Sequence, residues 1–186
     1  NRIFGNIHKM DPELDAGDVI SRKAIPITEK TYIGDILNQA VADVPVLYEK
    51  ALQKVFKNPD AFVVKGSLHG LRCYPRLPED SRVNWNESAK KICRLVRASS
   101  GPYNGAYSFL NGEKIIIWKA SVLKYKEKFL AVPGHVVAIK KDTGNIQVAC
   151  GEGMLEIQEI QYKENKMPPA EFIKSIRVRF KRDAHA

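Results

Sequence analysis

The order of apolar and polar residues predicts two strands and a helix within residues 1–58. Residues 2–10 and 19–27 are short, largely apolar runs separated by turn residues, so each run predicts a strand. From Thr31 onward the apolar residues recur at i, i+3, i+4 and i+7, which predicts a long amphipathic helix with Thr31 as its N-cap. Pro45 interrupts this pattern, and we expect a kink or a break in the helix there.

Residues 59–82 carry a different pattern, because Gly and Pro interrupt every apolar run. We interpret this stretch as a linker between a first domain at residues 1–58 and a second at residues 83–186. The second domain opens with a short helix. Its predicted N-cap is Asn84, and Glu87, three residues on, completes a capping-box-like pair.

The remainder of the second domain has the pattern of an all-β structure. Strands are predicted at five places, residues 106–110, 114–120, 134–140, 146–149 and 154–161. Asn111-Gly112 and Thr143-Gly144-Asn145 are typical hairpin turns between neighbouring strands. Several short strands in succession favour a small closed barrel of the OB type, since closure removes exposed strand edges. Residues 170–176 predict a short terminal helix or strand, and Trp85 and Trp118 are interpreted as core anchors rather than stacking platforms.

Composition narrows the class of protein and its compartment. The 186 residues carry a net charge of +9 with a pI near 9.4, which favours an anionic partner such as RNA, a nucleotide or a membrane surface. A basic surface without a special partner is the alternative. No apolar run is long enough to span a bilayer, so we expect no membrane partner. The three cysteines lack zinc-ligand spacing, so we expect no metal site and reduced thiols in a cytoplasmic protein.

One turn between the first two strands has the residues of an active-site loop. The segment Leu14-Asp15-Ala16-Gly17-Asp18 places a carboxylate beside a glycine, which lets the backbone approach a ligand. Asp15 could orient a neighbouring histidine or carry a proton through water. Turns are rich in Asp and Gly, however, so the motif alone favours an ordinary structural turn.

Two sets of motifs resemble the formyltransferases that use 10-formyltetrahydrofolate. The segment Ile7-His8-Lys9-Met10-Asp11, followed by residues 14–20, resembles the catalytic loop of that family. Further stretches resemble its C-terminal domain and follow in the family's order, at residues 82–85, 92–98, 102–106, 114–120, 133–134 and 149–153. The resemblance covers almost the whole chain and is specific to the family, although not to one substrate.

The resemblance implies a fold and a set of site residues. The fold is of the α+β class, with residues 1–58 as the remnant of a parallel-sheet formyltransferase domain and residues 83–186 as a C-terminal OB-like β-barrel. The resemblance implies that Asp15 is catalytic. It also implies that 10-formyltetrahydrofolate contacts the three residues that follow Asp15, namely Ala16, Gly17 and Asp18.

The resemblance also implies a partner that these 186 residues do not supply. The family uses an Asn-x-His segment with a Ser-Leu-Leu-Pro-like tail, in which Asn and His stabilise the developing oxyanion, and nothing here matches that whole pattern. His8 is no substitute, because it lies on the strand before the loop. We therefore expect an upstream catalytic segment as a partner and no activity from this chain alone.

The resemblance implies formyl transfer to a primary amine, with methionyl-tRNA as the first candidate acceptor and a nucleotide-linked amino sugar as the alternative. Methionyl-tRNA fits the barrel and the net charge, and its predicted contacts are Lys90, Lys91, Arg94, Arg97 and Lys119. A solvated helix face is the alternative for the first four residues. Lys119 also begins a basic run with interleaved aromatic residues, as single-strand binders often have, at Lys124, Tyr125, Lys126, Lys128 and Phe129.

The predicted linker favours the second class of acceptor. Residues 71–80 differ from the Ala-x-Lys-containing run of methionyl-tRNA enzymes and resemble relatives that formylate amino groups on nucleotide-linked sugars. A non-catalytic nucleic-acid or partner-binding module is a third hypothesis, of another class.

Overall fold

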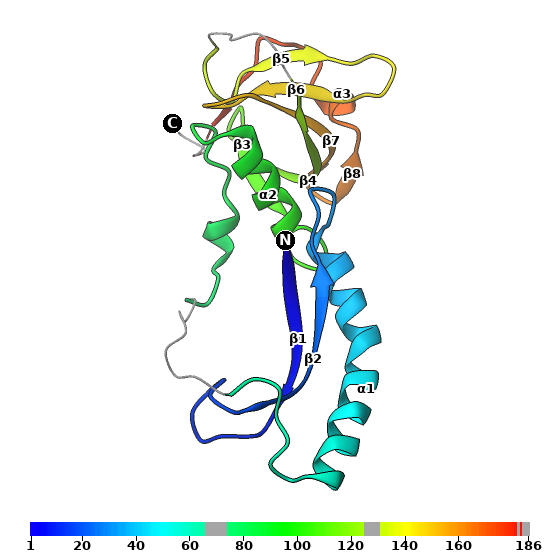
Figure 1. Ribbon diagram of the computed structural model, residues 1–186. Helices are drawn as coiled ribbons and strands as arrows, with labels where there is room; N and C mark the ends of the chain where they lie inside the picture. Colours follow the sequence, from blue (N-terminus) through cyan, green and yellow to red (C-terminus); the bar gives the residue numbers. More distant parts are fainter. Residues whose placement is uncertain (66–73, 125–130, 182, 184–186) are drawn as a thin grey trace. The chain divides into compact units, whose positions relative to one another are not determined.

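The computed structural model describes residues 1–65, 74–124, 131–181 and 183, and it divides the chain into two compact units (Figure 1). The first unit is Asn1–Pro75 and the second is Arg76–Ala186. Each unit is described by itself. The division into two domains and a linker at residues 59–82 stays a prediction.

The first unit is a β-hairpin packed against one long helix. Strands β1 (Arg2–His8) and β2 (Val19–Pro26) pair antiparallel, and helix α1 (Ile33–Lys57) lies along them (Figure 1). Both predicted strands and the helix are confirmed. Their pairing is antiparallel, so the described strands of this unit contain no parallel pair, and an origin in a parallel sheet stays a prediction.

The start of α1 differs from the prediction. The N-cap is Tyr32 instead of Thr31, and the Asp35 carboxylate accepts a hydrogen bond from the Tyr32 N–H at 2.8 Å. The Thr31 hydroxyl instead accepts a bond from the Thr28 N–H in the preceding turn. The helix continues through Pro45 without a break, because a proline removes one hydrogen bond while the packing of the following turns persists.

The hairpin covers only part of the apolar face of α1. Leu47 is buried against it, whereas Val41, Tyr48 and Phe56 are exposed by 74%, 54% and 84%. The sequence predicted one continuous apolar face, but two strands are too narrow to cover it. Although α1 has 25 residues, no helix within the described ranges is apolar enough to cross a membrane.

An ion pair fastens α1 to β2 and makes the first unit sensitive to pH. The Lys23 ammonium lies 2.6 Å from the Asp43 carboxylate, which is mostly buried and also accepts a bond from Gln39. The hydrogen bond from Lys23 lowers the pKa of Asp43 below its ordinary value of 3.8. A carboxyl group with a lowered pKa stabilises the fold above that ordinary value, and the stabilisation is lost as the pH falls through the lowered pKa.

We therefore expect Asp43→Asn to weaken the first unit at pH 7 more than at pH 3. The measurement is hydrogen exchange of α1 peptides, with wild type and variant compared at the same pH. Faster exchange in the variant at pH 7, with a smaller difference at pH 3, is the expected result. An equal difference at both pH values would show that the ionised carboxylate contributes nothing.

The second unit is an antiparallel sheet with a helix packed on it. The strands follow one another in the sheet as β5 (Val136–Ile139), β6 (Ile146–Ala149), β7 (Met154–Tyr162), β4 (Glu113–Leu123), β3 (Ala106–Leu110) and β9 (Phe180–Lys181), and β8 (Asn165–Met167) also pairs with β7. The helical elements are η1 (Pro78–Ser81), α2 (Ala89–Ser99) and α3 (Pro169–Phe172). All five predicted strands and both hairpin turns are confirmed, whereas β8 and β9 were not predicted.

The two ends of this sheet approach each other. The Val136 N–H donates to the Val178 carbonyl at 3.2 Å, and the Phe180 N–H donates to the Gly134 carbonyl at 2.8 Å. The start of β5 and the residues just before it thus pair with the start of β9 and the residues just before it. The sheet is strongly curled, and its assignment to the OB type stays a prediction.

The core of the second unit lies between the inner face of this sheet and α2. Ile92 and Val96 of α2 are fully buried, as is Ile117 of β4. Trp85 is a core residue, as expected, and its ring stacks on Phe180 with centroids 5.2 Å apart. Burial of these large apolar side chains is the main stabilisation of the unit.

The cap of α2 is Ser88, and the prediction of Asn84 is wrong. The Ser88 hydroxyl accepts a hydrogen bond from the Lys91 N–H at 3.3 Å. The helix begins at Ala89, so Asn84 lies too far upstream and binds the Asn86 N–H in a turn instead.

Candidate functional site

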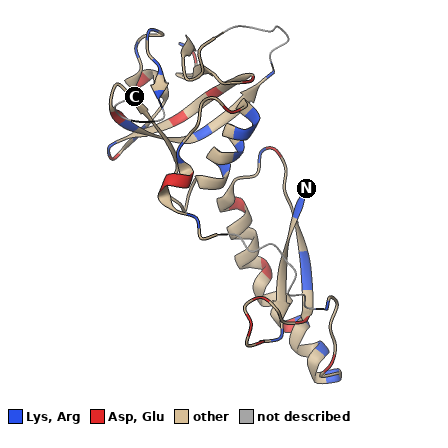
Figure 2. Cartoon of the chain, turned by 90° about the vertical axis from the view of Figure 1, so that its left-hand side faces the viewer, with Lys and Arg blue, Asp and Glu red and all other residues tan. Residues whose placement is uncertain are grey.

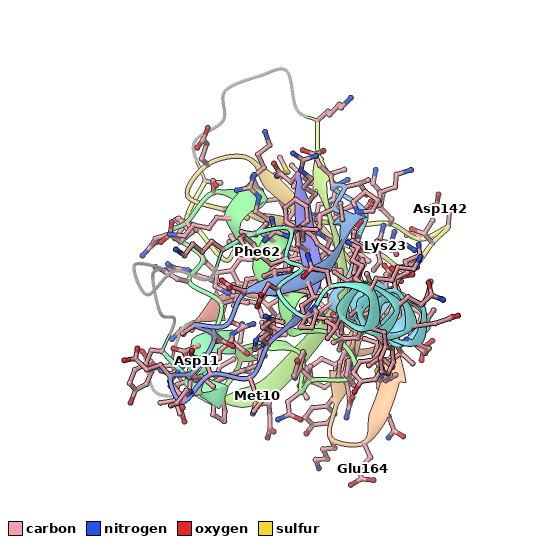
Figure 3. All side chains as sticks on the ribbon, turned by 60° about the horizontal axis from the view of Figure 1, so that its bottom comes forward. Met10, Asp11, Lys23, Phe62, Asp142 and Glu164 are labelled. Atoms are coloured by element: carbon pink, nitrogen blue, oxygen red, sulfur yellow. The ribbon has the colours of Figure 1, made fainter. Side chains whose placement is uncertain are left out.

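The loop between β1 and β2 is closed at its base by backbone pairing. The Lys9 N–H donates to the Asp18 carbonyl at 2.9 Å, which brings the two ends of the loop together. Val19, the first residue of β2, donates to the Val64 carbonyl at 2.8 Å, so a third segment supports the base. Met10, which follows Lys9 at the start of the loop, is 93% exposed (Figure 3).

Two residues of this loop have conformations that fit a ligand-binding turn. Gly17 is buried, and a Cβ atom added to it would lie 1.8 Å from the Lys9 carbonyl oxygen, so only glycine fits there. Asp15 is exposed and has a φ of 60°, in the left-handed region that Asp tolerates better than most residues. The loop therefore presents the Asp15 carboxylate to solvent above a tightly packed base.

The other polar groups of the loop hold its backbone. The Asp11 carboxylate accepts a hydrogen bond from the Glu13 N–H at 3.0 Å. The His8 ring donates through Nδ1 to the Lys9 carbonyl at 2.9 Å, because a carbonyl can only accept. Within the described parts of the chain, no three His, Cys, Asp or Glu side chains are grouped to hold a metal ion.

The predicted folate contacts differ in their accessibility. Gly17 is buried, whereas Ala16 and Asp18 are half-buried and adjoin the exposed Asp15. Their small side chains and backbone could approach a ligand closely. The roles assigned to these four residues stay predictions.

The predicted nucleic-acid contacts are partly engaged within the second unit. Lys90, Lys91 and Arg94 are exposed on α2, whereas Arg97 is half-buried against Cys93 with an N–S distance of 3.5 Å. Two of the lysines form ion pairs, Lys91 with Glu87 at 2.8 Å and Lys119 with Glu159 at 2.7 Å. The part of the basic run that follows Lys124 lies outside the described residues.

Charge is distributed unevenly between the units (Figure 2). Residues 76–186 contain 20 Lys and Arg against 12 Asp and Glu, whereas residues 1–75 contain 10 against 9. Nearly all of the net charge of +9 therefore belongs to the second unit, which favours a polyanion as its partner.

Two arginines that sequence reasoning did not select lie beside α2. Arg76 donates to the Ser99 hydroxyl at 2.7 Å, and Arg82 pairs with Asp183 at 2.6 Å. Both line a cavity of about 470 Å³ together with Lys91 and Arg94 of α2. The hydrogen bond to the Tyr107 hydroxyl raises the pKa of Arg82 above its ordinary value. These arginines precede α2 by seven or more residues, so the helical pattern gave no sign of them.

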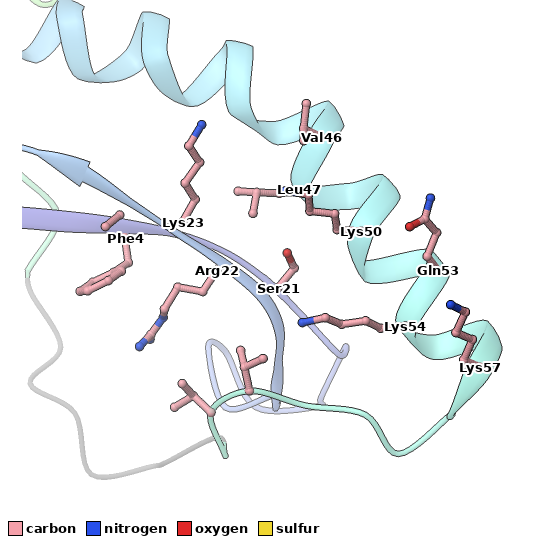
Figure 4. A pocket seen from close by; sticks show the side chains of 13 residues that line it. Phe4, Ser21, Arg22, Lys23, Val46, Leu47, Lys50, Gln53, Lys54 and Lys57 are labelled. Atoms are coloured by element: carbon pink, nitrogen blue, oxygen red, sulfur yellow. The ribbon is translucent and has the colours of Figure 1, made fainter.

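A second cavity, in the first unit, was also missed from the sequence. It measures about 770 Å³ and lies between β2 and the C-terminal half of α1 (Figure 4). The only signal in the sequence is the 4 and 3 residue spacing of Lys50, Lys54 and Lys57, which places the three on one helix face.

The cysteines described in the structure are unsuited to nucleophilic chemistry. Cys93 and Cys150 are both buried, and burial raises the pKa of the Cys150 thiol to about 12. Such a thiol stays protonated at neutral pH and is a poor nucleophile.

The family of the chain is decided by its second unit. The sequence profile of the formyl transferase C-terminal domain matches residues 77–177. The chain belongs to the formyltransferase family. The matched residues comprise α2 and most of the curled sheet, and they include the basic side chains of α2.

Relatives with assigned roles extend the similarity into the first unit. The methionyl-tRNA formyltransferase of Syntrophomonas wolfei is 35% identical over 169 residues, which covers 89% of this chain and 52% of that protein. The bifunctional polymyxin resistance protein ArnA of Wigglesworthia glossinidia brevipalpis is 28% identical over 158 residues, or 85% of this chain and 23% of that protein. The chain thus spans about half, or less, of the curated relatives that it matches.

Two solved structures with folate ligands share the fold. HypX from Aquifex aeolicus, in complex with tetrahydrofolic acid, matches 92% of this chain and 30% of its own with a TM-score of 0.64 and 21% identity. An N-formyltransferase from Helicobacter canadensis, in complex with folinic acid and dTDP-3-aminofucose, matches 83% of this chain and 55% of its own with a TM-score of 0.56 and 15% identity. At these identities the likeness shows the fold alone.

Proposed function

We propose that the protein containing this chain transfers a formyl group from 10-formyltetrahydrofolate to the primary amine of methionyl-tRNA. Family membership, established by residues 77–177, carries the proposal of formyl transfer. The folate ligands of the solved relatives support the donor, and the 35% identical methionyl-tRNA formyltransferase supports the acceptor. The positive charge of the second unit suits a tRNA.

The proposed reaction forms one C–N bond and breaks another. The amine nitrogen of the acceptor attacks the formyl carbon, and the carbonyl oxygen becomes an oxyanion in the tetrahedral intermediate. The bond from that carbon to N10 of the folate then breaks as N10 takes a proton. The nitrogen of the acceptor loses a proton, so the products are a formamide and tetrahydrofolate.

In this reaction Asp15 moves protons and orients the group that binds the oxyanion. Its exposed carboxylate can accept the proton of the attacking amine directly or through water. An Asn-x-His segment elsewhere in the protein stabilises the oxyanion. The one Asn-x-His triplet in these 186 residues, Asn6-Ile7-His8, lies on β1 before the loop and lacks the family's Ser-Leu-Leu-Pro-like tail, so the purified chain alone has no turnover under this proposal.

A nucleotide-linked amino sugar is the second candidate acceptor. Residues 71–80 resemble the sugar-formylating branch, although part of this stretch lies outside the described residues. Of the five cations predicted to contact tRNA, Lys91 and Lys119 are paired with carboxylates. Such pairing reduces their attraction to phosphate.

The two acceptors predict different behaviour of α2. With tRNA as acceptor, the Lys90→Ala/Lys91→Ala/Arg94→Ala variant of the full-length protein should bind methionylated initiator tRNA more weakly. The slope of log affinity against log salt should shrink by about 0.9 for each phosphate contact that is lost, because fewer counterions are released. Folding should survive, because these side chains lie on the exposed face of the helix.

The matched control is Lys140→Ala/Lys141→Ala/Lys163→Ala, which removes the same charge from exposed positions elsewhere in the second unit. If both triple variants lose the same affinity and slope, α2 makes no specific contact. If the full-length protein formylates a nucleotide-linked 4-amino sugar and binds tRNA no better than bulk RNA, the second acceptor replaces the first.

A further inference from the structure

The cavity of the first unit is a groove with several cations in its lining. Its main walls are residues 21–24 of β2 and the face of α1 that carries Lys50, Lys54 and Lys57, and the apolar side chains of Phe4, Val63 and Val64 complete the lining (Figure 4). We call it the β2–α1 groove. Its buried floor includes Ser21 and Leu47, each only 4% exposed. A volume of about 770 Å³ is within the range of ligand sites.

The charges that line this groove are all of one sign. Among the described residues that line it, five are cationic and none is a carboxylate; the cations are Arg22, Lys23, Lys50, Lys54 and Lys57. These five are half of the ten Lys and Arg of the first unit. A concave surface lined by one sign of charge concentrates the field and attracts ligands of the opposite sign.

Contacts within the protein hold three of these cations at the groove. Lys23 is fixed by Asp43 at 2.6 Å, a pairing that also reduces its attraction to phosphate, and Lys54 donates to the Ile20 carbonyl at 3.2 Å. Arg22 donates to the Asn6 side chain at 2.8 Å, and its guanidinium lies 4.6 Å from the centre of the Phe4 ring. Cations that are already positioned lose less side-chain entropy when a ligand binds.

Lys50 and Lys57 complete the groove from one helix face. Both are exposed, and they flank the tethered Lys54 at four and three residues. Lys57 also lies in the last turn of α1, where a cation stabilises the helix dipole. Because that stabilisation is independent of any ligand, a binding test needs a separate measurement of folding.

We propose that the β2–α1 groove binds phosphate groups of the formyl acceptor. The inference rests on the proposed function, because methionyl-tRNA and a nucleotide-linked amino sugar both carry phosphates. Ammonium and guanidinium groups recognise phosphate oxygens through charge-assisted hydrogen bonds. The groove lies outside residues 77–177, and one of its lining segments, residues 21–24, begins two residues after Val19, where the Asp15 loop ends. It adds phosphate contacts to the unit that carries the proposed catalytic loop.

The first test measures which lysines a ligand covers. The full 186-residue chain is acetylated at low reagent concentration, with and without a saturating short oligouridylate or uridine diphosphate, and each lysine is quantified by mass spectrometry. We expect Lys50 and Lys57 to be protected severalfold, whereas the exposed Lys30 should not change. Protection by the oligouridylate assigns the groove to RNA phosphates, and protection by uridine diphosphate alone assigns it to a nucleotide.

The second test removes the two exposed cations. Lys50→Ala/Lys57→Ala should weaken binding of the probe that protects these lysines about tenfold, because the variant loses hydrogen bonds between charged groups. With the oligouridylate, the salt slope should fall by about 0.7 for each lost contact. The control, Lys30→Ala/Lys140→Ala, removes equal charge from exposed positions outside the groove. Circular dichroism and thermal unfolding of both variants separate loss of binding from loss of the helix.

These outcomes distinguish a failure of the phosphate-binding proposal from a failure of the proposed function. If neither probe protects Lys50 and Lys57, or if both double variants weaken binding equally, the groove is not a phosphate site, whatever the protein formylates. If the lysines are protected but the full-length protein formylates neither acceptor, the proposed function fails while phosphate binding by the groove stands.

Discussion

In the full-length protein, Asp15→Asn is expected to lower kcat by about 10²- to 10⁴-fold, the usual contribution of a positioned acid or base. Asn has nearly the same size and tolerates the left-handed backbone that Asp15 adopts at φ 60°, so the loop should keep its shape. The substitution removes the negative charge and the ability to take a proton. Steady-state kinetics with the formylated folate and a saturating acceptor measure the effect.

The matched control for this variant is Asp11→Asn on the same loop. Asp11 is exposed, and its carboxylate accepts a bond from the Glu13 N–H, which an amide oxygen can also accept. Its turnover should stay within a few-fold of wild type. Unchanged turnover in Asp15→Asn would remove that residue from the mechanism, and an equal loss in both variants would indicate a general effect of charge.

Gly17→Ala is expected to disable the loop by displacing its backbone. The new Cβ atom would meet the Lys9 carbonyl oxygen at 1.8 Å, and backbone atoms cannot move aside as a flexible side chain can. Overpacking of this kind costs about 1–3 kcal/mol. A shift of about 1 Å at the loop would lower kcat about 10²-fold, because catalytic groups must be held closely in place.

Gly5→Ala in β1 is the control for this second variant. Its Cβ atom would lie 3.5 Å from a methyl group of Leu47, which is ordinary van der Waals contact. We expect Gly5→Ala to keep wild-type kcat, and Gly17→Ala to show faster hydrogen exchange at the Lys9 amide, which closes the loop. A Gly17→Ala enzyme with normal kcat would show that the packing beneath Asp15 is irrelevant to catalysis.

The periodic elements could be predicted from the sequence because local pattern determines them. The short, largely apolar run at residues 106–110 and the Asn111-Gly112 turn are sufficient to define the hairpin of β3 and β4. The caps were less predictable, because α2 is preceded by several polar residues, and only tertiary packing selects Ser88 over Asn84. Strand β9 has two residues, so it has no period of its own and exists through its pairing with β3.

The candidate sites also differ in how far the sequence alone predicts them. The Asp15 loop was found through its contiguous motif, whereas the burial of Gly17 beneath it required the structure. The β2–α1 groove could not be found from the sequence, because Arg22 and Lys50 come to line one cavity only after α1 folds back along the hairpin. The exposure of the apolar residues Val41, Tyr48 and Phe56 of α1 was not predicted, because helical spacing predicts an apolar face but not how much of it is covered.

Formyl transfer itself is tested most directly by following a labelled formyl group. The full-length protein is mixed with 10-formyltetrahydrofolate labelled in that group and with methionylated initiator tRNA or a nucleotide-linked 4-amino sugar. The account predicts that the label appears in an acceptor formamide, one for each tetrahydrofolate released, and that no tetrahydrofolate is released when the acceptor is omitted. Release of labelled formate at the same rate with and without either acceptor would contradict it.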